Sequence, residues 1–236
     1  MEAKILTLKD KQVAFQIYLL LAALFIASLI TCNLIFRKFF FWNPFGDGGF
    51  TFEQSVGILP YPITFLITDL ISEIFGSKKA NQVVFGGLIS SIFVLLIISV
   101  AGAAPATEWS PVTDDQYNHV FGQTALAIGA SMAAYLAAQY VDIRIFHFWK
   151  RLTKGKMLWV RNNFSTILSQ FLDTFLVILL LCVGEQIPWT LFWALVLNGF
   201  LFKVVIAIFD TPFFYLGTWL CRKRFKLAVG QELTID

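Results

Sequence analysis

The sequence predicts an all-α membrane protein, a bundle of six transmembrane helices with both termini in the cytoplasm. Its 236 residues are 58% hydrophobic and 14% charged, whereas a soluble domain carries about 25% charged residues. Mean hydropathy is +0.73, and the apolar residues fall into long runs joined by short polar segments. Because a helix needs about 20 apolar residues to cross a bilayer, these runs fill one integral-membrane domain over residues 1–236.

The apolar runs place the expected helices along the chain. The predicted spans are 12–36, 55–77, 80–103, 119–148, 162–183 and 190–220. The first run passes Thr31-Cys32, which superficially resembles a lipoprotein cleavage site, but apolar residues continue to Phe36 and favour a retained helix. The connection 38–50 is aromatic and contains Asn-Pro and Asp-Gly-Gly turn formers. It is expected at the membrane surface, as an anchored connection or as a lid over an entrance.

The orientation follows from the distribution of basic residues. Fifteen of the 18 Lys and Arg residues fall on one side of the predicted map. They are Lys4, Lys9, Lys11, Lys78, Lys79, Arg144, Lys150, Arg151, Lys154, Lys156, Arg161, Arg222, Lys223, Arg224 and Lys226. The opposite loops hold Arg37 and Lys38 together with most of the loop carboxylates. By the positive-inside rule, both termini are predicted to be cytoplasmic.

Several classes of function lack their characteristic residues. The net charge of +3 is explained by topology, so a nucleic-acid partner is not expected. Cys32, Cys182 and Cys221 show no metal-ligand or redox spacing, and no metal or cofactor is expected. His119 and His147 fall near opposite membrane surfaces, with no HExxH, GxSxG or Cys–His arrangement. The sequence therefore does not predict an enzyme.

Ionisable and amide side chains recur inside the predicted spans, where burial in lipid is costly and marks functional candidates. Asp69 and Glu73 are four residues apart and share one face of the second helix. Lys203 and Asp210 likewise share a face of the sixth. The fifth helix carries a polar stripe within about 100° of arc, made of Asn162, Thr166, Ser169, Gln170 and Asp173, and the fourth adds Gln139 and Asp142. The predicted substrate-binding residues are Asp69, Glu73, Gln139, Thr166, Gln170, Asp173, Lys203 and Asp210.

The depths of these residues suggest two layers. Counting 1.5 Å per residue from the outer helix ends puts Asp69, Asp173, Gln170 and Lys203 near the midplane, and Glu73, Asp210, Thr166 and Gln139 deeper towards the cytoplasm. The charge of Asp142 is expected to be compensated by Arg144 and neighbouring cations on the cytoplasmic side. Lys203 is expected to pair with Asp173, since a short loop makes the fifth and sixth helices antiparallel neighbours; Asp69 is the alternative partner. Excess acid suits a cationic or hydrogen-donating solute, and a purely structural tie between helices is the other interpretation.

Two long motifs carry a resemblance to a known family. The second helix contains the run PITFLITDLISEIFG over 62–76, and the fifth begins with WVRNNFST over 159–166 and continues with Ser169-Gln170 and Asp173-Thr174. Weaker matches are Thr31-Cys32-Asn33, Gln139 with Asp142, and Lys203 followed by Thr211-Pro212 and Tyr215. In these features the chain resembles the queuosine precursor transporter family, also called the putative vitamin uptake transporter family.

The resemblance implies a multi-pass transporter of the bacterial inner membrane that imports 7-deazaguanine bases, precursors of the tRNA nucleoside queuosine. Candidates are 7-cyano-7-deazaguanine, 7-aminomethyl-7-deazaguanine and queuine, carried by secondary or facilitated transport. A carboxylate can accept hydrogen bonds from a guanine-like edge while aromatic rings stack on the base. The alternative is the substrate-binding membrane subunit of an energy-coupling-factor vitamin importer, which needs a separate ATPase because this chain has no P-loop. The sequence does not decide whether the chain forms a homo-oligomer, and a structural assembly protein is a further alternative.

Overall fold

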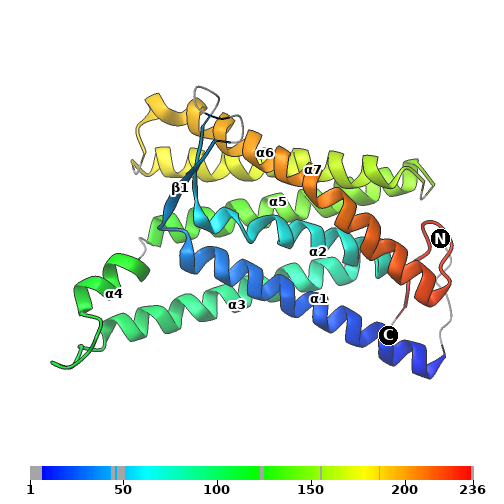
Figure 1. Cartoon of the computed structure of the whole chain (residues 1–236), viewed down its shortest axis with the longest axis horizontal. Coiled ribbons are helices and arrows are strands. Elements are labelled where there is room, and N and C mark those ends of the chain that lie inside the picture. The colour runs from blue at the N-terminus through cyan, green and yellow to red at the C-terminus, as the bar shows by residue number, and fades with distance from the viewer. Residues whose placement is uncertain are drawn as a thin grey trace.

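The computed structural model describes residues 7–43, 46, 51–122, 125–154, 156–185 and 187–234 and shows an elongated bundle of long helices (Figure 1). The helices are α1 (Leu8–Ile35), α2 (Tyr61–Ile74), α3 (Ser77–Ala103), α4 (Asp114–Phe121), α5 (Ala125–Leu152), α6 (Leu158–Val183) and α7 (Phe192–Phe225). Two strands, β1 (Phe39–Trp42) and β2 (Phe52–Ser55), and two 3-10 turns, η1 (Val56–Ile58) and η2 (Trp189–Leu191), complete the described elements. The all-α expectation therefore holds apart from this small sheet.

The outer surface of the bundle is suited to lipid. Within the described ranges, five helical stretches are long and apolar enough to cross a bilayer: α1, Val56–Ile74, α3, α6 and Trp189–Phe225. Large apolar side chains on these helices point outwards, among them Leu20, Ile97 and Leu201. In water such a surface would be an aggregation hazard, whereas in a bilayer it is the expected solvent contact. The chain is a multi-pass membrane protein.

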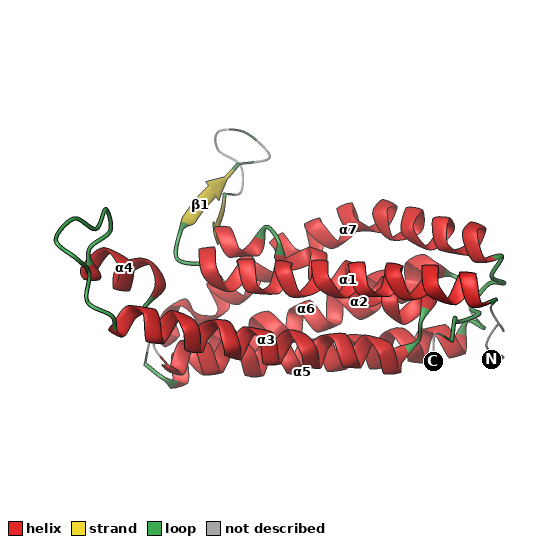
Figure 2. Ribbon diagram, turned by 90° about the horizontal axis from the view of Figure 1, so that it is seen from below, coloured by secondary structure: helices red, strands yellow, loops and turns green. Residues whose placement is uncertain are grey.

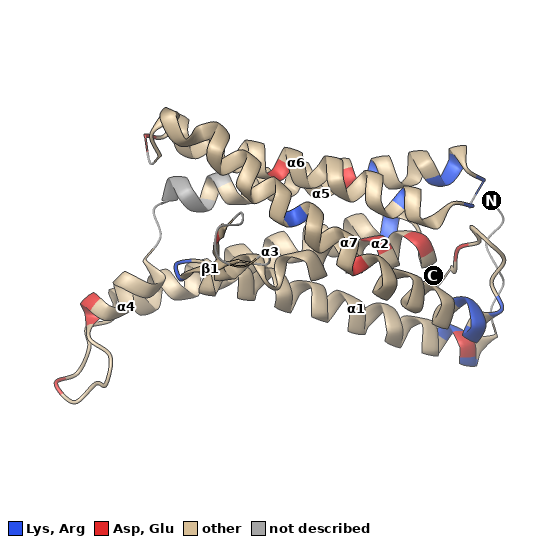
Figure 3. Cartoon of the chain, turned by 45° about the horizontal axis from the view of Figure 1, so that its top comes forward, with Lys and Arg blue, Asp and Glu red and all other residues tan. Residues whose placement is uncertain are grey.

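The two ends of the bundle differ in character. We call the end where α1 begins and α7 ends the terminal end, and the end that carries the β1–β2 hairpin and α4 the hairpin end (Figures 1 and 2). Lys and Arg gather at the terminal end, while carboxylates of α4 and its loop lie at the opposite end (Figure 3). The charge asymmetry read from the sequence is thus also an asymmetry in space.

Three of the predicted spans differ from the observed helices for local reasons. The predicted span 119–148 is two helices, because the Thr113–Gln116 capping box starts α4 and the Gly122 N–H closes it on the Asn118 carbonyl. The predicted span 55–77 becomes η1 followed by α2, which begins after Pro60. The last helix runs beyond 220 to Phe225.

The aromatic connection after α1 forms a hairpin rather than a loop. Phe39–Trp42 pairs antiparallel with Phe52–Ser55, and aromatic residues favour this extended conformation. The hairpin packs on α7 through Trp42 and Phe52, whose ring centroids lie 5.9 and 5.6 Å from that of Phe202. The predicted turn formers at 44–45 and 47–50 lie outside the described residues. This packing brings β2 and η1 into the bundle ahead of α2.

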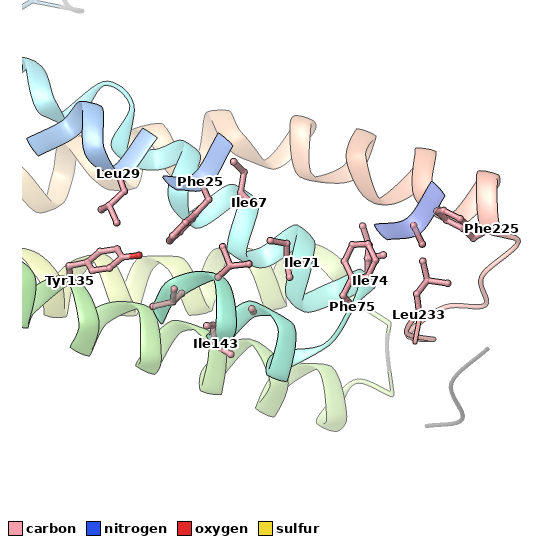
Figure 4. Close-up of a cluster of buried hydrophobic side chains, with 14 residues drawn as sticks. Phe25, Leu29, Ile67, Ile71, Ile74, Phe75, Tyr135, Ile143, Phe225 and Leu233 are labelled. Carbon is pink, nitrogen blue, oxygen red and sulfur yellow. The ribbon is translucent and has the colours of Figure 1, made fainter. Parts of the chain in front are cut away.

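The main apolar core lies towards the terminal end, between α1, α2, α3 and α5. Phe25 and Leu29 of α1 face Ile67, Ile71 and Ile74 of α2 in this core (Figure 4). The C-terminal segment joins it, because Leu233 is 3% exposed and its N–H donates to the Ile74 carbonyl at 2.7 Å. The core thereby fixes α2, which carries two of the predicted site residues.

Candidate functional site

A cavity of about 240 Å³ lies in the hairpin half of the bundle. Its lining comes from several elements: Cys32, Asn33 and Phe36 of α1, Ser55 of β2, Gly57 and Ile58 of η1, Tyr61 of α2, Ser131 of α5, Asp173, Val177 and Leu181 of α6, and Lys203 of α7. Ligand pockets for drug-sized molecules begin at about 300 Å³. This cavity therefore suits a small solute held by a few polar groups.

The central polar feature of the cavity is an ion pair. The Lys203 ammonium lies 2.5 Å from Asp173 Oδ2, and the two side chains are 11% and 5% exposed. The same ammonium lies 4.9 Å from the centre of the Tyr61 ring, close enough for a cation–π contact. The pairing of Lys203 with Asp173 expected from helix connectivity is confirmed. Sequence reasoning missed Tyr61, whose position one residue before Pro62 at the start of α2 was the available signal.

The break before α2 shapes one wall of this cavity. Pro60 has no N–H to donate and stands at the N-terminus of α2. η1 passes so close to α1 that a Cβ on Gly57 would lie 2.6 Å from the Cys32 carbonyl oxygen. The break between η1 and α2 therefore lines the cavity through Gly57, Ile58 and Tyr61. Pro212, by contrast, lies within an unbroken α7, and Thr211 Oγ1 donates to the Ala207 carbonyl at 3.1 Å.

Substituting Gly57 with Ala is expected to displace η1 and deform the cavity. Overpacking of this kind costs about 1–3 kcal/mol, which should appear as a lower thermal unfolding midpoint in detergent. Gly86→Ala on α3 is the matched control, because its added Cβ meets nothing within 4 Å and Ala improves helix propensity. Equal unfolding midpoints for the two variants would contradict the close approach of η1 to α1.

A second polar cluster lies deeper, between α2, α5 and α6. Thr166 Oγ1 donates to Asp69 Oδ2 at 3.2 Å, and Ser169 Oγ donates to Asp142 Oδ1 at 2.9 Å. The two carboxyl groups lie within hydrogen-bonding range of each other. All five members of the predicted α6 stripe are buried, so the expectation that the stripe faces the interior is confirmed.

Two expectations about this cluster are wrong. Asp69 is not level with Asp173 but next to Thr166, about two turns deeper, because β2 and η1 already enter the bundle before α2 begins. Asp142 is not compensated by Arg144, whose guanidinium lies 4.3 Å from the Tyr140 ring centre. The carboxyl of Asp142 instead turns to α2 and α6.

A third cluster, at the terminal end, is built on Glu73. Its carboxylate lies 2.9 Å from Arg161 Nη1, 2.6 Å from Arg222 Nη2 and 3.5 Å from Lys150 Nζ. Lys150 also contacts Glu232 Oε1 at 2.9 Å. Arg161 and Lys150 are 0% and 1% exposed. We call Glu73, Arg161, Lys150, Arg222 and Glu232 the ion cluster.

The ion cluster corrects the sequence-based picture of the basic residues. The sequence predicts that Lys150 and Arg161 lie between the spans 119–148 and 162–183, on the cytoplasmic side, whereas the structure buries both side chains in the bundle. The available signal was the spacing of Arg161, which lies four residues before Ser165 and eight before Ser169 on the same face of α6. Glu73 is therefore engaged by three cations and lies away from the cavity.

The three remaining predicted site residues, Gln139, Gln170 and Asp210, make fewer described polar contacts. Gln139 and Gln170 are 0% and 3% exposed, and amide atoms of both are buried with no hydrogen-bond partner in the described part of the chain. Asp210 is half-buried on α7 and joins none of the three clusters. The structure thus brings Asp173 and Lys203 together in the cavity, Asp69 and Thr166 in the deeper cluster, and Glu73 in the ion cluster.

The comparisons with known proteins agree on one family. The family described as "Putative vitamin uptake transporter" matches residues 55–217. A "Probable queuosine precursor transporter" of Bacillus subtilis (strain 168) is 23% identical over 168 residues, which is 70% of this chain and 72% of the relative. A protein of the same name from Haemophilus influenzae (strain ATCC 51907 / DSM 11121 / KW20 / Rd) is 30% identical over 161 residues, 67% of this chain and 66% of the relative. No solved structure matches the chain.

Proposed function

The chain belongs to the putative vitamin uptake transporter family, and from this premise we propose that it imports 7-deazaguanine precursors of queuosine across the bacterial inner membrane. The observation that carries the proposal is the Lys203–Asp173 pair inside a small cavity that α1, η1, α2, α5, α6 and α7 line together. Transporter sites are commonly built at such junctions, beside interrupted helices. The names of the two relatives supply the substrate class.

Asp173 is the proposed anchor for the base. The ammonium of Lys203 neutralises the carboxylate of Asp173. A deazaguanine presents its N1–H and exocyclic amine side by side, so it can donate two hydrogen bonds to one carboxylate and displace the ammonium. Tyr61, whose ring already accepts the ammonium at 4.9 Å, offers a face for stacking on the base.

The other predicted residues are assigned to the route inward. Gln170 and Thr166 lie on the same face of α6 as Asp173, and Gln139 of α5 and Asp69 of α2 are also buried. Glu73 closes the terminal end through the ion cluster, and Asp210 is assigned to the exit by its place on α7, on the face of Lys203. Inward release of the substrate then requires the ion cluster to open.

The proposed topology is six spans with both termini in the cytoplasm. α5 supplies the sixth span, because its 28 residues reach about 42 Å at 1.5 Å per residue and it packs along α6 and α3. The hairpin end then faces outwards, and the terminal end with its Lys and Arg faces inwards.

Single cysteines test this topology in a chain whose three natural cysteines, Cys32, Cys182 and Cys221, are replaced by Ala. Glu108→Cys should react with a membrane-impermeant maleimide in intact cells. Lys156→Cys should react only after the membrane is permeabilised. The reverse pattern would contradict the proposed orientation, and labelling of both sites from outside would contradict the even number of spans.

Uptake by the chain alone tests the function. The protein is expressed in bacteria that neither make nor import queuosine precursors, labelled 7-cyano-7-deazaguanine is supplied, and both uptake and queuosine in tRNA are measured. Asp173→Asn, which keeps the side-chain shape, should abolish uptake. Uptake by the purified chain in proteoliposomes without an ATPase would exclude the energy-coupling-factor alternative, and uptake that appears only with a partner ATPase would overturn autonomous transport.

A further inference from the structure

Asp69 and Asp142 form a carboxyl pair in the middle of the bundle. Asp69 is 1% exposed and Asp142 is 0% exposed, and the two groups lie within hydrogen-bonding range of each other. One oxygen of each carboxyl accepts a hydrogen bond, from Thr166 and from Ser169 respectively. The other oxygens, Asp69 Oδ1 and Asp142 Oδ2, are buried without a donor.

A single proton resolves this arrangement. Two ionised carboxylates in contact repel each other strongly in a medium of low dielectric constant, and a buried acceptor without a donor costs about 1–3 kcal/mol. A proton on either carboxyl removes one charge and supplies an O–H donor for the other group. Neither Thr166 nor Ser169 can replace it, since each already donates its single hydroxyl hydrogen. The hydroxyl of Ser165, which also lies near Asp142, donates to the Asn162 carbonyl at 3.2 Å.

The charged groups around the Asp69–Asp142 pair are balanced when the pair holds one proton. α2 presents Glu73, α6 presents Arg161, and α5 presents Lys150 on the terminal side of the pair, while α7 adds Arg222. His147 of α5 is partly buried and lies within electrostatic range of Lys150, Glu73, Arg151 and Arg161. The charges of α1 and α3 lie in their first turns, at Lys9, Asp10, Lys11, Lys78 and Lys79, and Asp210 of α7 is outside the clusters.

The pair and the ion cluster together hold four carboxyl groups and three cations. Glu73 and Glu232 face Lys150, Arg161 and Arg222, and Asp69 and Asp142 complete the set. With one proton on the pair the set is electrically neutral. Without that proton it carries one uncompensated negative charge in the membrane interior, which is costly.

A buried amide beside the pair points to a site that changes its protonation state. Gln139 lies three residues before Asp142 on the same face of α5, is 0% exposed, and has neither its amide nitrogen nor its oxygen paired in the described part of the chain. Such an amide can donate to a carboxylate when the proton leaves. Gln170, whose Oε1 is also unpaired, lies on α6 between Thr166 and Asp173 and connects the pair with the cavity.

We propose that the Asp69–Asp142 pair is a binding site for one proton, and that this proton is the ion whose movement drives transport. The inference rests on the proposed function for the transport step alone. An O–H bond forms on the pair when a proton enters from the outer side, and it breaks when the proton leaves to the cytoplasm, so one proton is carried inward per cycle and no other reactant is consumed.

Infrared spectroscopy tests the bound proton without any substrate. Difference spectra of the purified protein between acidic and alkaline buffer should contain a protonated-carboxyl stretching band that shifts in heavy water. Asp142→Asn and Asp69→Asn should each lose this band. Asp115→Asn, on the exposed face of α4, is the matched control and should keep it. A spectrum in which both site variants retain the band would overturn the proton site.

Proteoliposomes test the coupling. With the membrane potential clamped at zero, a pH difference of one unit should drive about tenfold accumulation of labelled 7-cyano-7-deazaguanine if one proton moves per base. Asp142→Asn should lose this accumulation entirely while still exchanging labelled for unlabelled base, because exchange requires no net proton movement. Loss of exchange together with accumulation would assign Asp142 to substrate binding and overturn its coupling role.

The remaining outcomes separate the two proposals. Accumulation driven by a sodium gradient and not by a pH gradient would overturn the proton as the coupling ion. If the wild-type protein carries no deazaguanine at all but shows the carboxyl band and its loss in the site variants, the proton site stands and the proposed substrate fails.

Discussion

Replacing Lys203 with Met is expected to destabilise the protein by about 3–5 kcal/mol, the cost of stranding one member of a buried ion pair. The ammonium of Lys203 lies 2.5 Å from Asp173, and only 11% and 5% of the two side chains are exposed. Met keeps the unbranched chain but leaves the Asp173 carboxylate with no cation at hand. The same reasoning applies in reverse to Asp173→Leu.

The double variant Lys203→Met/Asp173→Leu should be more stable than either single variant, because it removes both charges together. Thermal unfolding in detergent, followed by tryptophan fluorescence, measures the three variants. Lys223→Met is the control on the same helix, since Lys223 sits near the end of α7 over Trp219 and is exposed. A double variant no more stable than the worse single one would contradict the pairing.

Transport separates the structural and functional parts of the Lys203–Asp173 pair. If Asp173 also anchors the base, the double variant folds but carries no deazaguanine. Recovery of stability without recovery of uptake is therefore the expected pattern. Recovery of both would mean that the pair ties α6 to α7 and that the base is held by other groups.

The polar stripe of α6 and the Lys203–Asp173 pair could be predicted because both follow from helix periodicity and connectivity. A helix with apolar residues on most of its surface must turn its polar face inwards in a bilayer, and α6 does so along its length. A short loop also makes neighbouring helices antiparallel, which brought residues of similar depth together. These inferences needed no information on distant contacts.

Hydropathy alone does not predict the ion cluster or the carboxyl pair, because both depend on the depth at which the helix ends lie. Hydropathy places Arg161 just outside the predicted span 162–183. In the structure α6 begins at Leu158, and packing against α2 and α7 buries the Arg161 guanidinium. The hairpin had a similar effect on α2, since an extended segment before the helix shifted Asp69 from the level of Asp173 to that of Thr166. A count from apolar boundaries assumes straight helices with ends at the membrane surface.

Substituting Glu73 with Gln is expected to destabilise the protein about as strongly as Lys203→Met does. Its carboxylate contacts Arg161, Arg222 and Lys150, and the first and last of these are almost fully buried. Neutralising the hub leaves several cations facing one another in the interior, with Glu232, which is 34% exposed, as the remaining counter-charge. We expect a loss of about 3–5 kcal/mol.

The exposed ion pair between Asp10 and Arg224, with side chains 31% and 47% exposed, provides the control. Asp10→Asn should cost at most about 1 kcal/mol, because water and salt screen such a pair. Removing one of the stranded cations, in Glu73→Gln/Arg161→Met, should restore part of the stability that Glu73→Gln loses. Thermal unfolding in one detergent compares the wild-type protein with Asp10→Asn, Glu73→Gln, Arg161→Met and Glu73→Gln/Arg161→Met. If Glu73→Gln unfolds at the same temperature as Asp10→Asn, Glu73 is not the centre of the ion cluster. The same conclusion follows if adding Arg161→Met to Glu73→Gln lowers stability by as much as Arg161→Met alone lowers that of the wild-type protein. In the proposed transport cycle the same contacts open for inward release, so a Glu73→Gln protein that folds should also expose the terminal end. A cysteine placed at Ser72, whose carbonyl accepts a hydrogen bond from Lys150 at 3.3 Å, should then react faster with a maleimide supplied from the cytoplasmic side.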